Sequence, residues 1–135
     1  MTQSERPLSV WTFDGFWARL RGLIGRPPPP PEHAVWITPC RQVHTLGMGY
    51  AIDVLHLDAD GVILQRQTLA PWRLGRWVAG AAGVLELAAG EATRLGLAPG
   101  RRLRLIPAGT ACYPGVSTAA RGGGGEPMDR EEVDS

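Results

Sequence analysis

Residues 53–69 read DVLHLDADGVILQRQTL, and this stretch decides the fold class. Two runs of strand-forming residues, DVLHLD and VILQRQTL, flank a short segment from Asp58 to Gly61. Asp and Gly are typical of tight reversals between antiparallel strands. The stretch therefore predicts a β-hairpin within a domain built mainly of strands.

Outward from the hairpin, four further runs have the composition of strands. They are AVWIT (34–38), QVHTL (42–46), GVLELAAG (83–90) and RRLRLIP (101–107). EATRLGLAPG (91–100) predicts one or two helical turns before the last strand. With about six short strands and no strand–helix alternation, the chain predicts a mainly β fold (α+β at most), a compact antiparallel β-barrel or sandwich.

The segment TFDGFWARLRGLIG (12–25) predicts one N-terminal helix. Its aromatic and aliphatic residues fall at intervals of three and four, which places them on one helical face. These residues are Phe13, Phe16, Trp17, Leu20 and Ile24. The proline run at 27–31 ends the helix, because proline lacks the backbone donor and fixes φ.

The length of 135 residues predicts a single domain, and the composition predicts a disordered C-terminal tail. Residues 1–113 are expected to form a single β-rich domain. Residues 114–135 are rich in glycine and acid and cannot bury enough apolar area, so they predict a disordered tail.

Charge and hydropathy limit the possible partners and location. Residues 126–135 carry five acids against one arginine, about −4, so the rest of the +1 chain carries about +5. That excess is small and scattered, which argues against a nucleic-acid binder. No apolar run is long enough to span a membrane, and the N-terminus lacks the pattern of a secretory signal. A soluble, cytoplasmic protein is expected.

Four segments together resemble the domain-of-unknown-function family 192 (DUF192). They are FWARLRGLIGR (16–26), CRQVHTLGMGYAIDVLHLDADGVIL (40–64), APWRLG (70–75) and VLELAAGEATRLGLAPGRRL (84–103). The resemblance covers roughly residues 10–106. It implies a compact β-rich fold with a helix at the start and no particular activity, because the family is uncharacterised. This chain has Gly47 where the family often has an aromatic residue, and Ala88 where it has proline.

The candidate site residues lie in TPCRQVHTLGMGYAIDVLHLD (38–58): Cys40, His44, Thr45, Met48 and Asp53. In an extended strand, positions 40 and 44 lie about 13 Å apart, too far for one metal ion or a thiol–imidazole pair. We therefore expect mainly structural roles, with Thr45 and Asp53 bonding nearby backbone groups and Met48 filling the core. The alternative is a pocket in which these polar groups hold a small ligand or a peptide.

The function predicted from these residues is a non-enzymatic binding or accessory module with a polar cleft near His44–Asp53. It would engage an unknown protein or small molecule, with no metal, cofactor or assigned catalytic residue. The alternative is a hydrolase-like or metal-dependent enzyme that uses Cys40, His44 and Asp53, with a metal drawing on His33, His56 or Cys112.

Two further features remain open. PWRLGRW (71–77) interleaves tryptophan with arginine, as nucleic-acid surfaces do. We expect instead that its tryptophans cover the core while its arginines point outward. Cys40 and Cys112 are expected to be buried thiols, and a disulfide in an exported form is the alternative.

Overall fold

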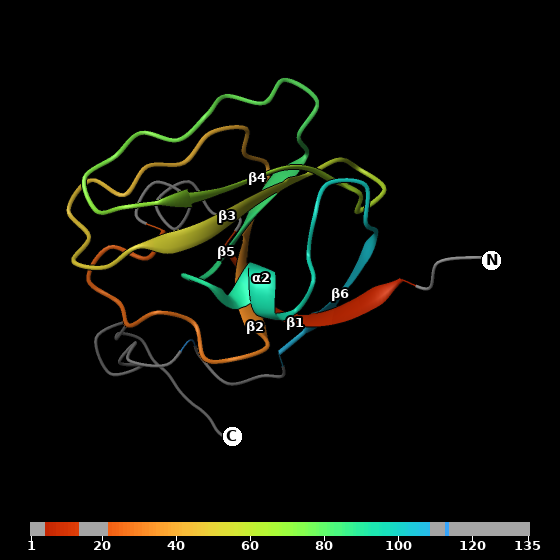
Figure 1. Cartoon of the computed structure of the whole chain (residues 1–135), viewed down its shortest axis with the longest axis horizontal. Coiled ribbons are helices and arrows are strands. Elements are labelled where there is room, and N and C mark those ends of the chain that lie inside the picture. The colour runs from red at the N-terminus through yellow and green to blue at the C-terminus, as the bar shows by residue number, and fades with distance from the viewer. Residues whose placement is uncertain (1–4, 14–21, 109–112, 114–135) are drawn as a thin grey trace, which may run out of the picture.

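The computed structural model describes residues 5–13, 22–108 and 113, and six strands within them form one sheet (Figure 1). The elements are β1 (Arg6–Phe13), β2 (His33–Ile37), β3 (Ile52–Leu57), β4 (Ile63–Leu69), β5 (Gly83–Ala88), α2 (Glu91–Arg94) and β6 (Leu103–Pro107). The strand order across the sheet is β4-β3-β5-β2-β1-β6.

The sheet is mixed rather than antiparallel. β3 pairs antiparallel with β4 and β5, and β2 pairs antiparallel with β5. β1 runs parallel to both of its neighbours, β2 and β6. The mainly β class, the hairpin and the short helix before the last strand are confirmed. The prediction of an antiparallel barrel or sandwich holds only in part, because the sheet is mixed and is not closed into a barrel.

β1 is the strand that the sequence did not predict. Its buried residues are Leu8, Val10 and Phe13, whereas its polar residues and Pro7 weaken the strand signal. The predicted helix start is wrong, because residues 12 and 13 complete β1. Residues 22–25 form a turn, with Gly25 at φ 74°. The middle of the predicted helix, residues 14–21, lies outside the described residues, as does the predicted tail, residues 114–135.

Each face of the sheet carries its own apolar cluster. One face packs Leu55, Leu57 and Leu85 against Ala92 of α2 and the segment that follows it. Figure 1 shows α2 lying in front of the sheet. The other face packs residues such as Ile37 and Val54 under the segments around residues 23 and 43–48. No helix in the described part of the chain is long and apolar enough to cross a membrane.

The edge strands β4 and β6 approach each other at one end through the hairpin turn. Val62 and Arg102 form an isolated antiparallel bridge, and Leu103 N donates to Gly61 O over 2.9 Å. Gly61 has φ 85°, and a Cβ built there would lie 2.6 Å from Leu103 O. A side chain at this position would therefore push β6 away from the turn.

We expect Gly61→Ala to destabilise the domain by about 2 kcal/mol or more, from the left-handed φ and the contact with β6 together. The matched control is Gly100→Ala, since Gly100 has φ 94° but no atom within 4 Å of its built Cβ. Urea unfolding compares the two variants. Equal losses of stability would contradict the close approach of the hairpin turn to β6.

Candidate functional site

Two long connections, residues 38–51 and 70–82, run side by side and are called here the double loop (Figure 1). Backbone hydrogen bonds join them along their length. The bonds are Thr45 N to Arg73 O (2.8 Å), Trp72 N to Thr45 O (2.9 Å), Gly75 N to Val43 O (2.8 Å) and Val78 N to Arg41 O (3.1 Å). The predicted strand QVHTL (42–46) is wrong, because these residues pair with a loop and form only one isolated bridge, His44 to Leu74.

Thr45 holds the two segments together. Its hydroxyl donates to Ala70 O over 2.6 Å and accepts from Arg73 N over 2.8 Å, and the residue is fully buried. Every polar group of Thr45 therefore has a partner in the double loop, as the prediction of a structural role required.

His56 of β3 binds the backbone near the start of the double loop and so ties the loop to the sheet. The imidazole is fully buried, and Nε2 donates to Arg41 O over 3.1 Å. Burial lowers the pKa of His56, and the backbone carbonyls of Arg41 and Arg76 act in the opposite sense. A neutral imidazole at this position fixes the loop to the sheet without a buried charge.

Asp53 connects β3 to its neighbours and to α2. Oδ1 accepts from Thr68 Oγ1 over 2.8 Å, while Oδ2 accepts from Gly90 N over 3.0 Å and from Ala92 N over 2.9 Å. Gly90 precedes α2 and has no side chain to cap it, so the buried Asp53 carboxylate provides the acceptor. The prediction that Asp53 accepts backbone N–H bonds is confirmed.

The other candidate residues lie in the first segment of the double loop. Met48 is buried in the core, as predicted. Cys40 and His44 are half-buried. Cys40 Sγ donates to Gln42 O over 3.2 Å, and His44 Nδ1 accepts from Leu46 N over 3.1 Å.

The structure thus gathers four of the five candidates in one loop and places the Asp53 carboxylate against Thr68 and α2. Among residues 5–13, 22–108 and 113, no group of three His, Cys, Asp or Glu residues could hold a metal ion. Cys112 lies outside this part of the chain.

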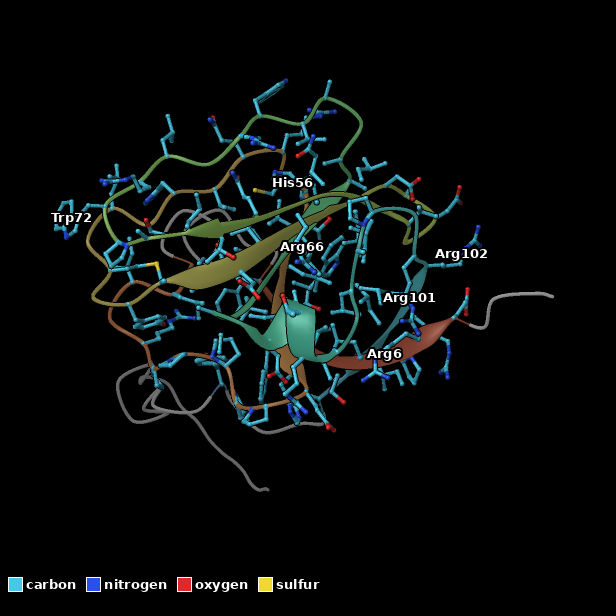
Figure 2. The ribbon with its side chains drawn as sticks, in the orientation of Figure 1. Arg6, His56, Arg66, Trp72, Arg101 and Arg102 are labelled. Atoms are coloured by element: carbon cyan, nitrogen blue, oxygen red, sulfur yellow. The ribbon has the colours of Figure 1, made fainter. Side chains whose placement is uncertain are left out.

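The outer side of the double loop is apolar and basic. Within the described residues, the large hydrophobic side chains that are exposed all belong to it: Leu46 (44%), Trp72 (64%), Leu74 (67%) and Trp77 (63%). Figure 2 shows Trp72 at the outer edge of the molecule, pointing away from the sheet. The prediction that these tryptophans cover the core is therefore wrong.

Three exposed arginines belong to the same two segments, and neither segment of the double loop contains an acidic residue. The arginines are Arg41, Arg73 and Arg76. The guanidinium of Arg41 lies 5.8 Å from the ring centroid of Trp77, within the range of a cation–π contact. We call Leu46, Trp72, Leu74, Trp77 and these three arginines the loop surface.

Glu86 is a buried residue for which the sequence predicts no role. It lies in the middle of β5, next to Val35 of β2 and Val54 of β3, and only 2% of it is exposed. Oε1 has no hydrogen-bond partner within the described part of the chain. Burial raises the pKa of Glu86 to about 8, so the carboxyl is protonated at neutral pH. The only signal in the sequence is one acid inside the apolar run VLELA.

Two phenols lie on the same side of the sheet. Tyr50 donates to Arg26 O over 2.8 Å and Tyr113 donates to Pro27 O over 2.6 Å. Burial, with a smaller contribution from Glu86, which is ionised at the high pH where Tyr50 titrates, raises the pKa of Tyr50 to about 12. Both hydroxyls thus act as donors that hold the segment around residues 26–27 against this face.

A small mixed β-sheet that carries an exposed loop surface is the class of domain that these features define. The chain belongs to the DUF192 family, described as "Uncharacterized ACR", whose profile matches residues 1–105. The resemblance seen in the sequence is thereby confirmed.

Two crystal structures share the fold. One is of a "putative transcription regulator" from Sinorhizobium meliloti 1021, with TM-score 0.59 and 25% identity, covering 70% of this chain and 79% of the other. The second is of a protein of unknown function from Novosphingobium aromaticivorans, with TM-score 0.63 and 18% identity, covering 69% and 71%. A comparison with curated proteins finds no match.

Proposed function

We propose that this protein is a non-enzymatic binding or accessory module that engages a protein partner through the loop surface. The observation that carries the proposal is that Leu46, Trp72, Leu74 and Trp77 are all exposed on one pair of loops. Exposed apolar side chains that gather in one place usually mark an interaction site. Tryptophan and arginine are also the residues that most often dominate binding energy at protein interfaces.

In this proposal the candidate residues have two kinds of role. His44 and Cys40 are half-buried within the double loop, where a partner could contact them. Thr45, Met48 and Asp53 form the framework, because their side chains are buried and bonded or packed within the domain. In the proposal the binding site is therefore the loop surface rather than a polar cleft near His44–Asp53. The buried hydroxyl of Thr45 holds together the two segments that carry that surface.

Two observations favour a protein partner over the alternatives. Leu46 and Leu74 offer aliphatic surface, whereas single-stranded nucleic acid is bound mainly by aromatic stacking and positive charge. The enzyme alternative needs Asp53 to orient His44, yet the two carboxylate oxygens of Asp53 already accept three bonds from Thr68, Gly90 and Ala92.

Site-specific photo-crosslinking in cells tests the proposal. A photoreactive amino acid replaces Leu74 in the full chain. A matched control places it at Arg102, which is exposed and lies on the opposite side of the molecule from Trp72 (Figure 2). We expect a discrete protein adduct from position 74, reduced roughly tenfold or more by W72S/W77S, and none from position 102. Equal adducts from both positions, or adducts with nucleic acid from position 74, would overturn the proposal.

A further inference from the structure

We infer that the acidic end of this chain, residues 126–135, is a ligand of the loop surface in the same molecule. The inference rests on the proposed function, since it names an occupant for the same surface. A docked end would compete with an external partner for the tryptophans and arginines, and would lower the apparent affinity for that partner.

Charge complementarity is the first argument. The segment EPMDREEVDS carries five acids against one arginine, and it includes two apolar residues, Met128 and Val133. The loop surface carries three arginines with no acid in either segment of the double loop. Arginine binds carboxylates through two parallel hydrogen bonds, and the apolar residues could pack on the exposed rings.

The arginines of the loop surface have neutral partners within the described residues. Arg41 Nε donates to Ala79 O over 3.1 Å, and Arg76 donates to the Gln65 side chain over 2.9 Å. Arg73 makes a long bond of 3.4 Å to a backbone carbonyl. By contrast, Arg94 is paired with Glu91 at 2.6 Å. The loop surface is therefore a basic region that its described surroundings do not neutralise.

The length of chain after the last described residue is the second argument. Tyr113 packs in the same apolar cluster as Val43 and Met48, which belong to the first segment of the double loop. Twelve residues, 114–125, separate Tyr113 from the acidic segment. An extended chain of that length reaches up to roughly 40 Å, whereas a domain of this size has a radius of gyration of only about 13 Å. The acidic end can therefore reach the loop surface.

A second group of arginines gives the test its control. Arg101 and Arg102 lie at the far side of the molecule from Trp72 (Figure 2). That region is mixed in charge, since the turn that pairs with Arg102 contains Asp58 and Asp60. Among the described residues, the exposed large hydrophobic side chains all belong to the double loop and none lies in this region.

Fluorine NMR of the full chain labelled with 5-fluorotryptophan tests the inference. The resonances of Trp72 and Trp77 are compared between the wild type and a variant whose five tail acids are changed to amides: E126Q, D129N, E131Q, E132Q and D134N. At about 20 mM salt, we expect each of the two resonances to differ in position between the wild type and the variant. At about 500 mM salt the positions in the two proteins should coincide, because screening weakens exposed charge contacts. Trp36, in β2, serves as the internal reference and should not move.

Two arginine variants locate the contact. R73Q/R76Q should make the two resonances insensitive to neutralisation of the tail, whereas R101Q/R102Q should leave that sensitivity intact. The inference is overturned if neutralising the tail leaves the Trp72 and Trp77 resonances in place, or if only R101Q/R102Q removes the effect. A protein adduct from position 74 would still support the proposed function in that event, so the two failures are distinguishable.

Discussion

Replacing Glu86 with glutamine is expected to raise the free energy of unfolding above that of the wild type by several kcal/mol near pH 9. Below about pH 4.5 this stability gap between the two proteins should be small. The reason is the cost of ionising a carboxyl that is 2% exposed and whose Oε1 has no partner in the described part of the chain. Glutamine has the shape of the protonated acid and does not titrate.

The sign follows from the two pKa values of Glu86. The pKa is about 8 in the folded domain, against 4.5 for an ordinary solvent-exposed glutamate. Between these values the folded chain holds one more proton than the unfolded chain, so each pH unit removes about 1.4 kcal/mol of stability. The full loss across that range is on the order of 5 kcal/mol.

Urea unfolding of the wild type and E86Q between about pH 4 and pH 9 measures this difference. His56 and the other titrating groups are common to both proteins, so their contributions cancel to first order. Glu91→Gln provides a control of opposite sign, because its contact with Arg94 lowers the pKa of Glu91. The ionised Glu91 side chain stabilises the folded state above about pH 4.5, and E91Q should lose this contribution. A stability gap between the wild type and E86Q that stays constant across the pH range would contradict burial of Glu86.

Replacing Asp53 with alanine is expected to cost about 4 kcal/mol of unfolding free energy, the other large effect. The change removes three hydrogen bonds to a buried carboxylate and leaves the N–H of Ala92 buried without an acceptor. Asp53→Asn should recover most of the loss, because one oxygen can face the two N–H groups while the amide donates to the Thr68 hydroxyl.

Thr68→Val is the matched control for this experiment, because it removes one of the three bonds and should cost only about 1 kcal/mol. Amide hydrogen exchange in D53A should show the largest acceleration at Ala92 and Gly90, with the double loop little changed. The role assigned to Asp53 would be wrong if D53A cost no more than T68V, or if exchange accelerated mainly in the double loop.

The sequence was most informative where structure is set locally. The hairpin of β3 and β4 is formed by neighbouring residues with a turn between them, so composition and turn chemistry suffice. β1 was missed because its partners, β2 and β6, are distant along the chain and pair with it in parallel. Its proline and polar residues also hid a strand whose apolar positions are buried.

The candidate site divides in the same way. The bonding of Thr45 and Asp53 to backbone groups follows from the chemistry of their side chains, so it could be predicted. The exposure of Trp72 and Trp77 could not, because a tryptophan has the same sequence signal whether it is buried or exposed. QVHTL was misassigned for a related reason, since strand-forming residues do not reveal that their partner is a loop.

Amide hydrogen exchange on the complex with the partner captured from position 74 tests the binding role of the loop surface most directly. We predict protection of residues 41–46 and 72–78 in the complex, with α2 and β6 exchanging as they do in the unbound protein. Protection confined to α2 and β6, with residues 72–78 unchanged, would contradict it.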